Sequence, residues 1–214
     1  MVTKTNDFLF GNNPHGENNL LGHRSKDLDK LNLNNYILFA GCSITWGVGL
    51  DVEETYPYLT AKSLNLDYYN LAIPGGNIEL AIVNIFSFLK NIKEKPKFIV
   101  LQYPGPHRFL LSDDLINFKN VGPWVEIPEE RNVLVDLYQT KYLYTKYYLW
   151  VQLAKCINVP VIHINHENNP FAKRFIDTLV IKHLDFARDN SHSGVKTHLN
   201  FTNILVEHII NLDL

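Results

Sequence analysis

Short apolar runs alternate along the chain with segments of helical spacing. Four runs are closed by turn residues and predict buried strands, at residues 36–40, 68–73, 98–101 and 159–164. Apolar residues recurring every three or four positions predict helices, at residues 55–65, 78–89, 132–157, 171–181 and 195–212. Strands that alternate with helices indicate βαβ units, a parallel sheet and helices on both of its faces. In such sheets, ligands bind beyond the carboxyl ends of the strands.

Two polar segments lack any sustained period. Residues 1–35 are rich in Asn and Gly, and we expect an extended N-terminal arm lying over the domain, with a short turn around residues 27–31. Residues 107–132 carry Pro, Gly and mixed charges, which predicts an insertion or lid-like loop. The expected organisation is therefore an arm, 1–35, followed by a single domain, 36–214.

Composition narrows the class of protein. The chain has 214 residues, 46% hydrophobic and 20% charged, as in an ordinary globular domain. A net charge of −2 with scattered Lys and Arg argues against nucleic acid as a principal partner. Apolar runs are too short for a membrane span, and the first residues lack the apolar core of a signal peptide. With only two cysteines no disulfide framework is expected, so we expect a reducing, cytoplasmic location.

The first segment whose residues could take part in a reaction directly follows the first predicted strand. It reads Gly41-Cys42-Ser43-Ile44-Thr45-Trp46-Gly47. A serine at a strand-to-helix turn lies exposed near the free N–H groups of the helix start. The alternative is a plain helix cap, with Ser43 accepting from the N–H of Trp46 or Gly47. A nucleotide-binding loop is disfavoured, because neither the dinucleotide glycine fingerprint nor a Gly-Lys-Ser/Thr phosphate loop is present.

Two further segments could complete a site around such a serine. Asp189-Asn190-Ser191-His192 precedes the last helix, and a serine nucleophile needs a base and a group that orients the base. The alternative for this segment is a solvated loop that caps the helix. Residues 70–77, after the second strand, contain a glycine pair whose N–H could stabilise an oxyanion, or which simply forms a β-to-α turn.

Together the three segments resemble the blocks of the GDSL, or SGNH, hydrolase family, in order and spacing, over roughly residues 36–212. The resemblance implies a flavodoxin-like three-layer α/β/α sandwich with a central parallel sheet. It also implies ester hydrolysis with Ser43 as nucleophile, His192 as base and Asp189 as the residue that orients it. Gly75 would supply an oxyanion-hole amide beside that of Ser43.

The sequence departs from the family pattern at two places. Cys42 stands where the family has aspartate, which raises the alternative that the thiol is the nucleophile. The family's third block carries an asparagine that donates to the oxyanion, and none follows the third predicted strand here. Either Gln102, His107 or Arg108 replaces it, or the oxyanion hole has one donor fewer, a loss that costs about 10²–10³ in rate.

The expected function is therefore a serine esterase that needs no metal or other cofactor. Its substrate would be a small-molecule or carbohydrate ester, with a carbohydrate O-acetyl ester among the candidates. Acyl transfer by the same fold and a non-catalytic ligand-binding module are the alternatives. His163 and His166, at the end of the fourth predicted strand, could instead bind a metal, but two ligands at this spacing occur commonly by chance.

Overall fold

The central feature of the computed structural model is a parallel sheet of five strands. The structure describes residues 18–105, 108–112, 118–121, 145–167 and 174–212. The sheet has the order β2-β1-β3-β6-β7, and its strands are β1 (Tyr36–Ala40), β2 (Asp67–Asn70), β3 (Phe98–Tyr103), β6 (Val161–His166) and β7 (Leu179–Ile181). All four pairs within it are parallel.

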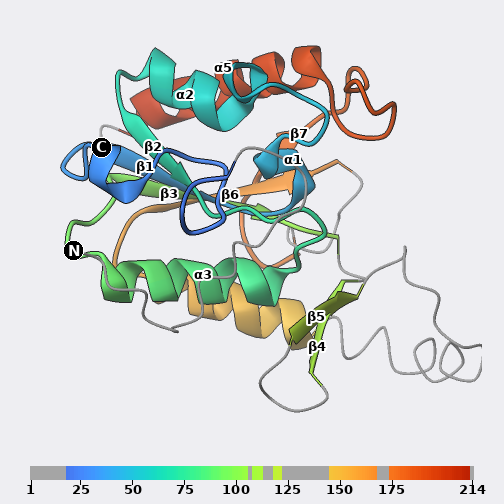
Figure 1. The fold of residues 1–214 in the computed structure, drawn as a ribbon. Helices are drawn as coiled ribbons and strands as arrows, with labels where there is room; N and C mark the ends of the chain where they lie inside the picture. Colours follow the sequence, from blue (N-terminus) through green and yellow to red (C-terminus); the bar gives the residue numbers. More distant parts are fainter. Residues whose placement is uncertain (1–17, 106–107, 113–117, 122–144, 168–173, 213–214) are drawn as a thin grey trace, which may run out of the picture.

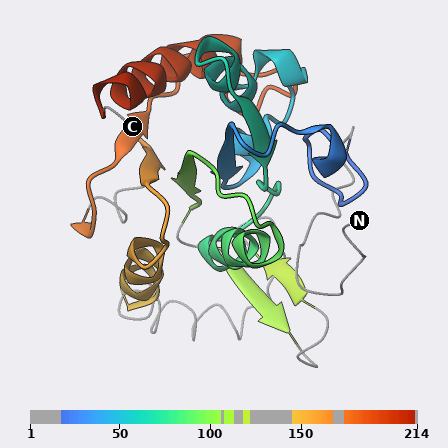
Figure 2. The same cartoon turned by 90° about the vertical axis from the view of Figure 1, so that its left-hand side faces the viewer.

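Helices cover both faces of this sheet. On one face lie α2 (Tyr56–Ser63) and α5 (Val195–Asn211), and on the other lie α3 (Ile78–Asn91) and the helical stretch 145–155 (Figures 1 and 2). Alternate residues of β1 serve the two layers: Leu38 packs in the core beneath α3, while Phe39 packs in the core beneath α2 and α5. The predicted three-layer α/β/α sandwich is therefore confirmed.

Short elements join these layers. A 3-10 helix, η1 (Leu28–Lys30), lies in the N-terminal segment, where His23 is 1% exposed and its ring packs against Tyr69. The one-turn helix α1 (Ser43–Trp46) follows β1, and the 3-10 helix η2 (Val52–Glu54) leads into α2. Among the described residues, no helix has both the length and the apolar character needed to cross a bilayer.

The prediction of a helix at residues 171–181 is wrong over its described part. Leu179–Ile181 forms β7 and pairs with β6, so tertiary pairing at the sheet edge overrides the local spacing. Residues 168–173 lie outside the described part. The second strand ends earlier than predicted, at Asn70, and the fourth begins and ends two residues later, at Val161–His166.

The expected loop at 107–132 contains two strands. β4 (Phe109–Ser112) and β5 (Phe118–Val121) pair antiparallel in a separate sheet. Backbone groups can satisfy one another across such a pair without any side-chain period, which is why the pattern did not predict it. Residues 107, 113–117 and 122–131 of this segment, and residues 132–144 of the predicted long helix, lie outside the described part.

Candidate active site

Strand order places the candidate site at the carboxyl edge of β1 and β3. The chain crosses from β1 to β2 on one side, and β3 lies on the other side of β1. Loops leaving the two neighbouring strands diverge at such a switch point, which is where open α/β sheets bind ligands. Ser43 follows β1 at this point, as the first residue of α1.

Ser43 is buried rather than exposed as the sequence suggested, with 5% of its surface accessible. The turn after β2 packs against the same segment, with Ile73 N–H donating to Gly41 O at 3.3 Å. The helix-cap alternative is also wrong, because no side chain caps α1. Ser43 Oγ instead lies 4.0 Å from Cys42 Sγ, its one recorded polar contact within the described residues.

A buried amide holds the chain just before Ser43. Gln102 Oε1 accepts from Cys42 N–H at 3.0 Å, from the Cys42 thiol at 3.1 Å and from the Thr45 hydroxyl at 3.3 Å. The Thr45 hydroxyl also shares a 2.7 Å hydrogen bond with the Tyr56 hydroxyl. Because the Cys42 side chain is buried and hydrogen-bonded here, these contacts favour a structural role for the thiol over nucleophilic attack.

Gly41 leaves room for this amide. A Cβ at position 41 would lie 2.5 Å from Thr45 Oγ1 and 2.7 Å from Gln102 Oε1, so no larger residue fits. The close approach of the Thr45 and Gln102 side chains to the backbone at this point therefore requires glycine.

Gly75 lies in the turn that follows β2, beside this segment. It has a positive φ of 74°, in a turn closed by Gly76 N–H donating to Ile73 O at 2.8 Å. Within the described residues, neither the N–H of Gly75 nor that of Ser43 has a hydrogen-bond acceptor. Two backbone donors without an acceptor, after the carboxyl ends of the paired strands β1 and β2, are what an oxyanion hole needs.

Asp189 and His192 form a hydrogen-bonded pair. His192 Nδ1 lies 2.5 Å from Asp189 Oδ2, and Asp189 Oδ1 accepts the N–H groups of Ser191 and His192, each at 3.0 Å. Partial burial acts to raise the pKa of Asp189, but hydrogen bonds from the amide and ring of His192 and from Ser191 outweigh it and hold the pKa at about 2. The carboxylate is therefore ionised at neutral pH and fixes the imidazole through Nδ1.

The role of capping the last helix belongs to a different aspartate. Asp185 Oδ2 accepts from Lys196 N–H at 3.0 Å, and Asp185 Oδ1 accepts from Thr197 N–H at 2.9 Å. These are donors of the first turn of α5, which has no capping side chain at its own N-cap residue, Gly194. The loop of Asp189 is solvent-exposed, as the alternative expected, but within the described part of the chain Asp189 makes none of the hydrogen bonds that cap the helix.

The loop that carries Asp189 lies against the segment that follows α1. A Cβ at Gly49 would come within 3.1 Å of the carboxyl carbon of Asp189. Among the described residues, however, no hydrogen bond joins Ser43 to His192. In unliganded hydrolases this bond is often long and shortens only with substrate bound. The assignment of Ser43, Asp189 and His192 as a triad, with Gly75 in the oxyanion hole, stays a prediction.

The histidines considered for metal binding have other environments. His163 shares a 2.8 Å hydrogen bond with the Tyr103 hydroxyl, and burial lowers its pKa to about 4. Burial also lowers the pKa of His166. Among the residues that the structure describes, no group of three or more His, Cys, Asp or Glu side chains could hold a metal ion.

Of the three residues considered as a third oxyanion donor, one lies beside the predicted hole. The Gln102 amide is engaged with Cys42 and, through Nε2, with Tyr103 O at 2.8 Å. Arg108 Nη1 donates to Gly76 O at 3.2 Å, next to Gly75. His107 lies outside the described residues.

Two residues of the site neighbourhood were missed from the sequence. Gly49 contacts Asp189, and Arg24 donates to Gly47 O at 2.7 Å and to Leu50 O at 2.6 Å from the N-terminal segment. The spacing of Gly47 and Gly49 could have flagged a tight turn, but a lone arginine in a polar arm gives no signal. Their partners are distant in sequence or are backbone atoms.

Comparison with family models and with curated proteins gives no match. Solved structures do match. One is a carbohydrate esterase whose active site has divergent catalytic and non-catalytic binding functions, with a TM-score of 0.51, 19% identity and coverage of 83% of this chain and 65% of that one. Another is the acetyl xylan esterase Est2A from Butyrivibrio proteoclasticus (TM-score 0.50, 15% identity, 83% and 63% coverage).

A third match is the psychrotrophic esterase EstA from Pseudoalteromonas sp., with a TM-score of 0.50, 16% identity and coverage of 83% of this chain and 98% of that one. The chain thus spans 65% and 63% of the length of the two carbohydrate esterases but nearly all of EstA. At these identities the likeness concerns the fold alone. The chain therefore has the three-layer α/β/α fold that it shares with these three esterases.

Proposed function

We propose that the chain is a serine ester hydrolase. Ser43 Oγ attacks the acyl carbonyl while His192 Nε2 takes its proton, and Asp189 holds the imidazole through Nδ1. The N–H groups of Ser43 and Gly75 stabilise the oxyanion, and the ester bond then breaks as the alcohol leaves with the proton from His192. His192 next takes a proton from water, which attacks the acyl group on Ser43, and Ser43 recovers its proton as the acid is released. This chemistry uses side chains and backbone alone, without a metal or other cofactor.

The observation that carries the proposal is that the two aspartates before α5, Asp185 and Asp189, accept hydrogen bonds from different partners. Asp185 satisfies the helix start, so the hydrogen bonds of Asp189 converge on its own loop and on the ring of His192. An imidazole held at Nδ1 by an ionised carboxylate presents Nε2 as a base. A loop with only a capping role would not need this second carboxylate.

Arg108 is our candidate for the third oxyanion donor. Its guanidinium reaches the carbonyl of Gly76, the residue after the proposed oxyanion glycine. A charged donor could contribute as much there as an amide. We expect Arg108→Gln to lower kcat, and by no more than the roughly 10²–10³ that such a donor supplies.

For the substrate we propose a small ester, with an O-acetyl group on a carbohydrate as the first to test, since two of the matched structures are carbohydrate esterases. The decisive experiment treats the protein with a fluorophosphonate probe and locates the adduct by mass spectrometry. We expect labelling at Ser43, its loss in Ser43→Ala, and hydrolysis of 4-nitrophenyl acetate that follows the same pattern. Absence of any adduct at Ser43 would contradict the proposal.

A second candidate function is a non-catalytic ligand-binding module. It is favoured by the position of the Ser43 hydroxyl, whose recorded contact within the described residues is Cys42 Sγ and not His192. Binding of an acetylated sugar without turnover or labelling would support it. Acyl transfer, the third possibility, shares the labelled serine and differs in forming a new ester when an acceptor alcohol is added.

A further inference from the structure

We propose that Arg188 and Gly49 form a docking contact that seats the Asp189–His192 loop against the segment following Ser43. Arg188 acts here as a positioning residue, through Asp189, and this inference rests on the proposed esterase function. Neither residue belongs to the three segments on which the resemblance was based.

Gly49 provides the surface on which the loop rests. Arg188 N–H donates to Gly49 O at 3.3 Å, and Gly49 has a positive φ of 78°. A Cβ at this position would meet Ala187 Cβ at 2.9 Å and the Asp189 carboxyl carbon at 3.1 Å. Only glycine permits both the backbone conformation and this close approach, so the side chains of Ala187 and Asp189 rest directly on the backbone of Gly49.

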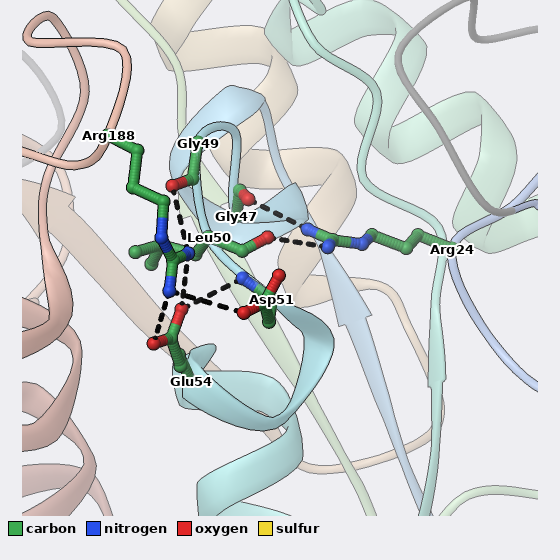
Figure 3. Close-up of polar contacts among 7 residues, drawn as sticks. All are labelled: Arg24, Gly47, Gly49, Leu50, Asp51, Glu54 and Arg188. Carbon is green, nitrogen blue, oxygen red and sulfur yellow. Dashed lines mark hydrogen bonds and ion pairs between the residues drawn. The ribbon is translucent and has the colours of Figure 1, made fainter.

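The Arg188 side chain adds a second attachment (Figure 3). Its two terminal nitrogens contact the two carboxylate oxygens of Glu54, each at 2.8 Å, and Nη2 lies 3.2 Å from Asp51. Glu54 is itself fixed, because its carboxylate also accepts from Asp51 N–H at 2.9 Å in a capping box at η2. The hydrogen bond from Arg188 keeps the pKa of Glu54 low. The fork-to-fork geometry defines direction as well as distance.

The receiving segment is held from its other side as well. Arg24 donates to Gly47 O and Leu50 O (Figure 3). Its guanidinium carbon also lies over the Trp46 ring, 4.3 Å from the ring centroid. Residues 47–51 therefore lie between two arginines that are far apart in sequence. Because residues 47–51 are fixed in this way, they do not follow a displacement of Arg188, and the neighbouring Asp189 is displaced instead.

The Arg188–Glu54 ion pair is exposed, so its loss should affect the position of the loop more than the free energy of unfolding. The side chain of Arg188 is 57% exposed and that of Glu54 is 27% exposed. Ion pairs this exposed contribute little to folding and weaken in salt. The catalytic rate is more sensitive to loss of this ion pair than the folding free energy is, because a small displacement of a base from its nucleophile reduces the rate.

The test compares Arg188→Gln with Lys26→Gln as a matched control. Lys26 makes an ion pair of the same length, 2.8 Å, with Asp67, and is 56% exposed, but lies in the N-terminal segment. We expect kcat on 4-nitrophenyl acetate to fall at least about twofold in Arg188→Gln, because the base is displaced from its nucleophile, with KM unchanged and Tm nearly so. Glu54→Gln should behave like Arg188→Gln, and Lys26→Gln like the parent. In 1 M NaCl the parent should approach the variant.

Hydrogen exchange gives a readout that does not depend on activity. The amide of residue 188 should exchange faster in Arg188→Gln than in the parent and in Lys26→Gln. If the parent is labelled at Ser43 while kcat and exchange are the same in all variants, the docking inference is wrong and the esterase proposal stands. If the parent is not labelled at Ser43, the esterase proposal fails and the positioning role fails with it, whatever the exchange shows.

Discussion

Gln102→Leu should destabilise the protein by disrupting the turn before Ser43. The side chain is 1% exposed, and its carbonyl oxygen accepts the buried N–H of Cys42 at 3.0 Å. Leucine has a similar size but accepts nothing, so the Cys42 N–H and thiol both lose their acceptor. An unsatisfied buried donor costs about 1–3 kcal/mol and a lost side-chain hydrogen bond about 1 kcal/mol, giving a total near 3 kcal/mol.

Denaturation and labelling together measure this effect. For a domain of this size 1 kcal/mol lowers Tm by roughly 2–4 °C, so we expect a fall of about 6–12 °C. Fluorophosphonate labelling of Ser43 should slow by about tenfold or more, since displacement of the turn misaligns the hydroxyl. Thr60→Val is the control, because Thr60 is fully buried and its hydroxyl has no partner among the described residues.

Gln102→Glu sharpens the test. Its carboxyl can accept from Cys42 N–H, but it can donate to Tyr103 O, as Gln102 Nε2 does, only when protonated. Burial and this hydrogen bond both raise its pKa in the folded state, so its stability should fall as pH rises above the carboxyl's ordinary pKa near 4.3. If Gln102→Leu is as stable and as reactive as Thr60→Val, the role given to this amide is refuted.

Three other predictions concern stability, and the first of them also compares stability with activity. Asp185→Ala should lower the free energy of unfolding by about 1–2 kcal/mol through lost capping, whereas Asp189→Ala should abolish hydrolysis with a smaller effect in urea denaturation; the reverse order would contradict the assigned roles. Burial lowers the pKa of His198 to about 4, so between pH 6.5 and 4 the unfolded chain binds a proton that the folded chain does not. The free energy of unfolding should therefore decrease by roughly 2–3 kcal/mol as the pH falls from 6.5 to 4, and by less in His198→Asn. Lys146→Met should cost about 3 kcal/mol in the same assay, because it strands the carboxylate of Glu79, 2.7 Å away in a largely buried pair, and adding Glu79→Gln should recover part of it.

The sandwich could be predicted because its signals are local. The five apolar residues of β1 are all fully buried, and the spacing of α3 and α5 follows directly from the face each one packs on the sheet. What failed was set by tertiary pairing. Leu179–Ile181 forms a strand because it pairs with β6 at the edge of the sheet, and three residues are too few for a period to show this, although Val180 and Ile181 are β-branched.

The candidate site could be predicted in part for a related reason. Asp189 and His192 are three residues apart, so one loop suffices to pair them, and the pair is present. Gln102, in contrast, is a polar residue inside an apolar strand, which signals a buried partner without saying which one. Its partner Cys42 lies 60 positions away, and only the parallel pairing of β1 with β3 brings the two together.

Asp185 and Asp189 have different hydrogen-bond partners because of the shape of the loop that joins them to α5. Phe186 and Ser193 form an antiparallel bridge, and Ala187 N–H donates to His192 O at 2.8 Å, so the chain folds back on itself as a narrow hairpin. Asn190, with a φ of 56°, makes the reversal, a conformation that asparagine tolerates better than most residues. The hairpin leaves Asp185 at its base, beside the first amides of α5, and Asp189 at its tip, beside His192. Two identical side chains four residues apart thus meet different partners. The contacts with Gly49 and Arg188 can hold the tip of the hairpin without changing the start of α5.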